Sequence, residues 1–209
     1  MEKKKSKFIS FIDNLWYHEK AKIIIFFVLA AFLIISISQC ASNKTPDIYL
    51  LYAGDESVPA SILNACKTNM KDFIPEDYNK DGSISSVFQT YRFQDELGTD
   101  NKKLFDNEII YGNTVILFLS PKNFEYCLKQ NYIVSLKDAL GYLPSAANNN
   151  YSIEFFDLEC ATEMGLSLLP EDTLVCVAAP NNTNAKTNEY NNQIEFLKYM
   201  IEWQNQKGE

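Results

Sequence analysis

The six residues IYLLYA, Ile48–Ala53, decide the predicted fold, because they form an apolar run that ends at Gly54. An uninterrupted run of this length is typical of a parallel strand that is buried on both faces. Further strands are predicted over Val115–Leu119 and Leu174–Ala178. Ile84–Phe93 is rich in β-branched and aromatic residues and is predicted to be another strand.

Helical patterns alternate with these strands. Apolar residues at helical spacing predict a helix over Ser57–Phe73 and a weaker one over Asn101–Ile110. A third helix is predicted over Ser120–Gln130, since serine followed by proline is typical of a helix N-terminus. A last, amphipathic helix is predicted from the stripe Tyr190, Ile194, Leu197 and Ile201. Strands that alternate with helices indicate βαβ units, so we predict an α/β fold with an open, mostly parallel sheet in three layers.

Two stretches give weaker signals. Leu136–Leu140 is predicted to be a short helical turn. Between Tyr142 and Pro170 the apolar residues have no clean period. We therefore expect this segment to pack against the sheet and to contribute a short additional strand.

An uncharged segment near the N-terminus predicts where the protein resides. Ile23–Gln39 has 17 residues without a charge, about 26 Å of helix at 1.5 Å per residue. Roughly 17–25 such residues span a bilayer. Six lysines and three acidic residues precede the segment, whereas 13 basic and 24 acidic residues follow from Cys40 onward. Lysines on one flank favour a cytoplasmic N-terminus and an exported C-terminal part.

We therefore predict a basic amphipathic cytoplasmic segment over 1–20, a transmembrane helix over 21–39 and a tether over 40–46. An extracytoplasmic α/β domain follows over 47–209, so the protein would be a single-pass protein of the cell membrane that contacts the lipid bilayer through one helix. Two alternatives remain open. The first is a signal peptide cleaved after Ala41, although Gln39 would then stand where a signal peptidase prefers a small residue. The second is a lipoprotein modified at Cys40, although Gln39 again takes the place of a small residue.

The composition of the exported part excludes several classes of function. Its one arginine is Arg92, and the single histidine of the chain, His18, precedes the apolar segment. Ser-His-Asp and Cys-His catalysis and imidazole metal sites are therefore excluded. Nucleic acid is not an expected partner, because phosphate binding needs clustered cations. The exported domain has four cysteines, Cys66, Cys127, Cys160 and Cys176. We interpret them as free residues of the core, and the alternative is that they form two disulfides.

The segment Asp77–Ile84, DYNKDGSI, matches the first two-thirds of a calcium-binding loop. Side-chain oxygens at alternate positions converge on a cation because Gly82 permits a sharp turn. The twelfth position holds Phe88 in place of the usual bidentate glutamate, so the site would be completed from elsewhere, for example by Glu76 or Asp95. The alternative is an Asx-rich turn that needs no metal. The candidate calcium ligands are Asp77, Asn79, Asp81 and Ser83.

Two acidic pairs follow predicted strands. Asp55-Glu56 and Asp95-Glu96 stand at carboxyl ends of strands, where open α/β sheets bind ligands. Paired acids can act as general acid and base, but the sequence supplies no apolar pocket that would raise the pKa of one of them. We therefore predict that the four acids are solvent-exposed and that the protein is not an enzyme.

Two segments resemble the extracellular solute-binding proteins of ABC importers. Val115–Leu140, VILFLSPKNFEYCLKQNYIVSLKDAL, is similar to their strand, helix and turn, and Leu174–Trp203 is similar to their strand, loop and helix. Such proteins have two lobes and about twice this length, so the resemblance implies a single lobe and transfers no binding residues. With WYHEKAKIIIFFV at Trp16–Val28, the chain is also similar to small membrane-anchored bacterial proteins of unknown function that carry a DxNxDG turn.

Three functions are compatible with these features. The first is a membrane-anchored accessory module that binds a protein partner. The second is a sensor or capture domain for a small ligand or calcium. The third is a carboxylate-dependent hydrolase of the cell envelope, which the missing acid pocket makes the least favoured.

Overall fold

The computed structural model describes residues 17, 19–22, 24–34, 45–93, 98–186 and 188–206. Two compact units are distinguished, Met1–Thr45 and Pro46–Glu209. In the first unit, residues 19–22 and 24–34 are helical. Within the described part of the chain, no helix combines the length and the apolar character that a membrane crossing requires. Residues 23 and 35–39 of the predicted transmembrane helix, and nearly all of the predicted cytoplasmic segment and tether, lie outside the described residues.

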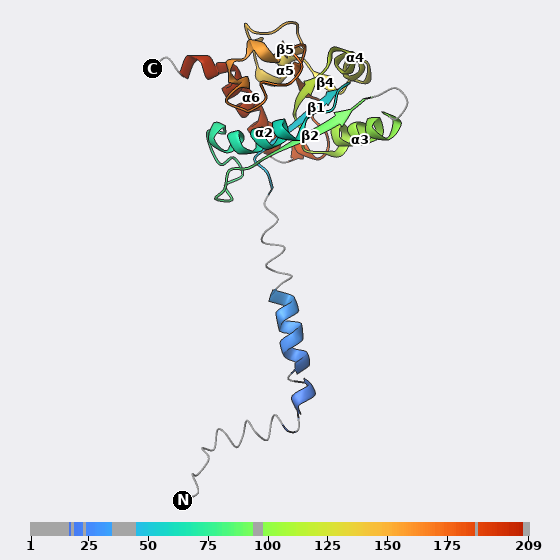
Figure 1. Cartoon of the computed structure of the whole chain (residues 1–209), viewed down its shortest axis with the longest axis vertical. Helices are drawn as coiled ribbons and strands as arrows, with labels where there is room; N and C mark the ends of the chain where they lie inside the picture. Colours follow the sequence, from blue (N-terminus) through green and yellow to red (C-terminus); the bar gives the residue numbers. More distant parts are fainter. Residues whose placement is uncertain are drawn as a thin grey trace, which may run out of the picture. The chain divides into compact units, whose positions relative to one another are not determined.

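The second unit contains a six-stranded sheet with the order β2-β1-β3-β6-β4, in which β5 also pairs with β6. Strand β1 (Ile48–Gly54) lies between β2 (Ser86–Arg92) and β3 (Ile116–Leu119), and both pairings are parallel (Figure 1). Strand β6 (Leu174–Ala178) is antiparallel to β3. The short strands β4 and β5, Ile133–Val134 and Ser152–Glu154, both pair with β6 in antiparallel fashion. The fold is therefore α/β with an open, mixed and mostly parallel sheet.

The direction of β6 differs from the simple βαβ expectation. Between β5 and β6 the chain forms two short 3₁₀ turns, η1 (Phe155–Asp157) and η2 (Glu159–Ala161). A parallel neighbour needs a crossover of a dozen or more residues, usually a helix, whereas an antiparallel neighbour does not. Every residue of β6 is buried, so its apolar pattern predicts a strand without indicating its direction.

Helices cover both faces of the sheet. On one face, α2, α5 and α6 form a core with the β1 residues that point to that face, such as Leu50. On the other face, α3 and α4 form a core with the alternate β1 residues, such as Leu51. Helix α2 begins at Ala60, later than predicted, because Pro59 holds the N-cap position and disfavours helical backbone in the residue before it. The helices are α2 (Ala60–Phe73), α3 (Gly98–Tyr111), α4 (Pro121–Gln130), α5 (Leu136–Leu140), η3 (Asn184–Lys186) and α6 (Glu189–Gln206).

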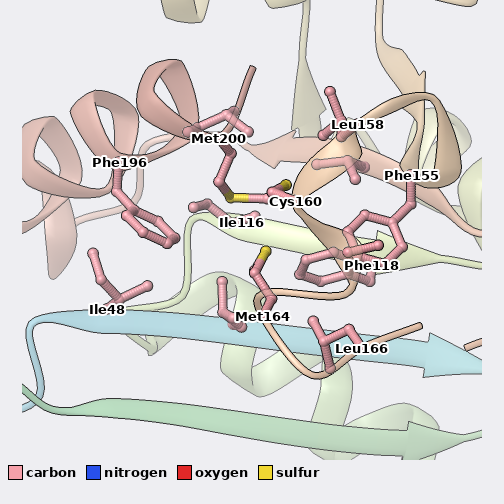
Figure 2. Packing of buried hydrophobic residues seen from close by; sticks show 14 of the residues in the cluster. Ile48, Ile116, Phe118, Phe155, Leu158, Cys160, Met164, Leu166, Phe196 and Met200 are labelled. Atoms are coloured by element: carbon pink, nitrogen blue, oxygen red, sulfur yellow. The ribbon is translucent and has the colours of Figure 1, made fainter. Parts of the chain in front are cut away.

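The segment Tyr142–Pro170 contributes much of the core beneath α6. Figure 2 shows Cys160 next to the strand that carries Ile116, and Met164 between this strand and β1. Phe155 packs edge-on against Phe118 of β3, with ring centroids 5.0 Å apart. The segment also contains β5, so the predicted additional strand and its packing against the sheet are confirmed.

The same segment approaches α2 very closely at Gly165. This glycine has a φ of +73°, and a Cβ added to it would lie 2.8 Å from the backbone carbonyl carbon of Ala65. Only a residue without a side chain can adopt this backbone conformation here without moving α2.

Candidate functional site

The four predicted calcium ligands lie together in the turn between α2 and β2. Oδ2 of Asp77 accepts a hydrogen bond from the Gly82 N–H at 2.7 Å. Oδ1 of Asn79 accepts from the Asp81 N–H at 2.9 Å. Oδ1 of Asp81 accepts from the Ser83 N–H at 2.9 Å and from the Ser83 hydroxyl at 2.7 Å. The polar side chains therefore hold the turn closed through its own amides.

Asp47, directly before β1, fixes this turn from outside. The whole residue is only 4 % exposed. Oδ1 accepts from the Asn79 N–H at 3.0 Å, and Oδ2 accepts from the Ser85 N–H at 2.8 Å. The sequence reasoning missed Asp47; the available signal was a single acid immediately before a fully buried strand. One carboxylate thus joins the start of the sheet to both ends of the turn.

The geometry of the turn is compatible with both readings of the motif. The Asx-type hydrogen bonds account for the polar residues without a metal. A carboxylate has about four lone-pair sites, so acceptance of one or two amides leaves capacity for a cation. Among the described residues, three or more Asp, Glu, Cys or His side chains do not meet in a metal-binding arrangement, but the motif itself contains only two carboxylates. Of the two residues proposed to complete the site, Asp95 lies outside the described residues.

The other one, Glu76, borders a polar hollow beside the turn. The hollow has a volume of about 490 Å³, and Asp77, Asn79 and Glu189 also line it. Burial raises the pKa of Tyr78, another lining residue, to about 12, and the charge of Glu76 adds to this effect. Its hydroxyl therefore stays neutral at physiological pH. The hollow places carboxylate and amide oxygens next to the motif.

A second, smaller pocket lies where β1 ends, and we call it the Tyr52 pocket. Its volume is about 250 Å³. The lining residues with polar groups are Tyr52, Glu56 and Ser57. Apolar lining comes from Val58, Pro59, Ile62, Leu168, Leu169 and Pro170. The carboxyl ends of parallel strands are where open α/β sheets bind their ligands.

Tyr52 reaches this pocket because of the glycine two residues later. Residues two apart in a strand lie on the same face, and the Tyr52 ring occupies the space that a side chain at Gly54 would need. Tyr52 is only 2 % exposed. Among the residues that the structure describes, none forms a hydrogen bond with its hydroxyl. Burial raises the pKa of Tyr52 to about 12, with further contributions from the charges of Asp172, Glu56 and Asp55.

The acidic pair after β1 agrees with the sequence prediction in one respect and corrects it in another. Asp55 and Glu56 are both exposed, as predicted. The expectation that no apolar pocket adjoins them is wrong, because Glu56 lines the Tyr52 pocket. One wall of that pocket comes from Leu168–Pro170, more than a hundred residues away in the chain. The second acidic pair, Asp95-Glu96, lies outside the described residues.

The four cysteines of the α/β unit are free and buried, as predicted. Burial raises the pKa of Cys66, Cys127 and Cys160 to about 12, and it raises the pKa of Cys176 well above its usual range. The thiolate is the nucleophilic form of cysteine. These thiols therefore serve as small apolar side chains of the core.

No protein-family model, curated protein or solved structure matches the chain.

Proposed function

We propose that the protein is a single-pass membrane protein whose α/β unit lies outside the cytoplasm and acts as a non-enzymatic binding or accessory module for a protein partner. The observation that carries the anchor is the apolar helix of residues 24–34. It carries no charge, and nine large apolar side chains between Ile24 and Ile34 are each at least 51 % exposed. A helix that is hydrophobic all round belongs in a membrane or in a large core.

The free energy supports the same assignment. Burial of one Val, Leu, Ile or Phe side chain contributes about 1.5–3 kcal/mol. Nine such side chains therefore favour transfer to hydrocarbon by more than about 10 kcal/mol. Lysines before residue 23 favour a cytoplasmic position for that flank, and this supports the proposed export of the C-terminal unit.

A binding role is favoured over catalysis by the state of the reactive groups. Asp55 and Glu56 are exposed, so burial does not prepare either one as a general acid. The four buried thiols are protonated at physiological pH. The relation of this unit to a single lobe of a solute-binding protein stays a prediction.

Site-directed labelling tests the topology. In a variant without native cysteines, Ser42→Cys should react with a membrane-impermeant maleimide on intact cells that lack an outer-membrane barrier. Ser6→Cys should react only after permeabilisation, and labelling of position 6 alone would reverse the orientation. Chemical crosslinking in intact membranes tests the partner, because a complex should yield a heteromeric adduct and a solitary module would yield none.

Calcium binding is a second candidate function, favoured by the position of the motif. Its four predicted ligands share one turn, and Asp77 and Asn79 face a hollow that Glu76 and Glu189 also line. An extracellular-type site has a Kd of about 10⁻⁴–10⁻³ M. Calcium at about 100 times the Kd would stabilise the fold by roughly 2.7 kcal/mol.

The calcium proposal is tested by thermal unfolding of the unit Pro46–Glu209. A gain of this size should raise the Tm by about 5–11 °C for a domain of about 150–250 residues. Asp81→Ala should abolish the shift, whereas Asp72→Ala, a change of an exposed acid on α2, should preserve it. If millimolar calcium leaves the Tm of the unmutated unit unchanged, the calcium proposal is wrong and the motif is a turn that needs no metal.

A further inference from the structure

We propose that the Tyr52 pocket binds a primary ammonium group that carries a small apolar substituent. This inference goes beyond the proposed membrane-anchored module and does not depend on it. The pocket lies at the carboxyl end of β1, between the start of α2 and the segment before β6. Three properties of its lining define the ligand: size, hydrogen bonding and charge.

The apolar lining limits the ligand to a small hydrocarbon group. Val58 and Ile62 line the pocket from the α2 side, and Leu169 and Pro170 line it from the other. Its volume of about 250 Å³ is below the roughly 300–1,000 Å³ of sites for drug-sized molecules. Leu168, at the same pocket, is 73 % exposed. An apolar substituent would cover part of this leucine and remove it from water.

The Tyr52 hydroxyl supplies the hydrogen-bonding requirement. The Tyr52 side chain is 2 % exposed as a whole, and its hydroxyl has no hydrogen-bond partner among the described residues. The hydroxyl oxygen is not among the fully buried unpaired polar atoms of those residues, so it keeps access to solvent. Tyr52 is a lining residue of the pocket, so a ligand bound there lies beside this side chain. An ammonium N–H can donate to the hydroxyl oxygen of Tyr52 and a second N–H can donate to the Glu56 carboxylate.

The charge of the surroundings selects a cation. Glu56 lines the pocket, and Asp55 and Asp172 are close enough to act electrostatically on Tyr52. Two positive charges oppose these acids: the N-terminus of α2, which is equivalent to about +0.5 of an elementary charge, and Arg92, whose Nε–H donates to the Asp55 carbonyl oxygen at 3.3 Å. Three carboxylates outweigh Arg92 and the half charge together, and none of the described lining residues is itself a lysine or arginine. A ligand with a carboxylate or phosphate is therefore disfavoured.

Three probes with one carbon skeleton test the proposal on the full chain in detergent micelles. Isoamylamine should bind in a titration followed by ligand-observed NMR, isoamyl alcohol should bind more weakly, and isovalerate should not bind. Glu56→Gln should weaken isoamylamine about two- to fivefold, as for an exposed ion pair. Tyr52→Phe should weaken it about two- to tenfold, as for one lost hydrogen bond. Glu125→Gln, which changes an exposed glutamate on α4, should leave binding unchanged.

Two peptide arms identify the source of the amine. A blocked Leu-Lys-Leu peptide that binds more tightly than isoamylamine and loses affinity in Glu56→Gln would assign the pocket to a lysine of a partner protein. Tighter binding of the free amine would assign it to a small molecule. The blocked Leu-Gln-Leu peptide controls for the apolar contacts. The proposal is overturned if isovalerate binds as well as isoamylamine, if Glu56→Gln changes nothing, or if no amine binds; none of these results affects the membrane topology.

Discussion

Removal of the Asp47 carboxylate should destabilise the α/β unit more than any change within the turn itself. Asp47→Ala eliminates the acceptors of the Asn79 and Ser85 amides, at 3.0 and 2.8 Å. A hydrogen bond to a charged group contributes about 1.5–3 kcal/mol net. Both amides are part-buried, so water restores some of the lost energy. We therefore expect a loss near the lower end of the sum, about 3–4 kcal/mol.

Urea unfolding of the unit Pro46–Glu209 measures this loss. Trp203 is a suitable fluorescent probe, because its ring packs 4.9 Å from that of Phe73 and 5.4 Å from that of Tyr199. Asp47→Asn keeps one acceptor oxygen and should give an intermediate loss. Asp72→Ala removes an exposed acid of α2 and should change the stability by no more than about 0.5 kcal/mol.

Asp47→Ala could instead lower the free energy of unfolding no more than Asp72→Ala does, with the same dependence of that free energy on urea concentration. This result would refute the assigned role of Asp47. That result would mean that β1 and β2 position the turn without the carboxylate. A loss of about 3–4 kcal/mol that calcium does not alter would instead assign the polar residues of the turn to stability alone.

Further predictions concern the backbone and the buried thiols. Gly165→Ala should cost about 2–5 kcal/mol, because it combines left-handed backbone with overlap against α2. Gly141→Ala, at a φ of +86° with open space around it, should cost only about 1–2 kcal/mol, and equal losses would contradict the close approach. Iodoacetamide at pH 8 should modify the folded unit far more slowly than the urea-unfolded chain; equal rates would mean that the thiols are accessible. The free energy of unfolding should fall between about pH 9 and 12. The thiols of Cys66, Cys127 and Cys160 ionise near pH 9 in the unfolded chain but remain protonated in the fold. Melting curves across that pH range would detect the loss of stability.

The sequence predicts the features that depend on local patterns. The apolar runs around β1, β3 and β6 are long and end at glycine, serine or alanine-proline, so their positions are nearly those of the structure. Strand β4 has two residues, which is too short for any period to be visible. The antiparallel direction of β6 leaves no trace in a strand that is buried on both faces.

The candidate sites also differ in whether their residues are close together or far apart in the sequence. The turn Asp77–Ser83 closes through hydrogen bonds between neighbours, so its shape follows from its own residues. Asp47 acts on that turn from 32 and 38 positions away. The Tyr52 pocket needs Glu56 and Leu168 to meet across more than a hundred residues. Contacts at such separation are set by the packing of the whole unit, which no local pattern contains.

The late position of β6 in the chain has a consequence for synthesis. Strands β3, β4 and β5 all precede β6 in sequence, yet each of them pairs with it. Until Leu174–Ala178 has left the ribosome, the edge of β3 stays open, and β4 and β5 have no strand to join. Exposed strand edges of this kind promote association between incomplete chains. A chain that stops before Leu174 therefore lacks the middle of its sheet, and premature termination should yield aggregating fragments in place of a smaller folded domain.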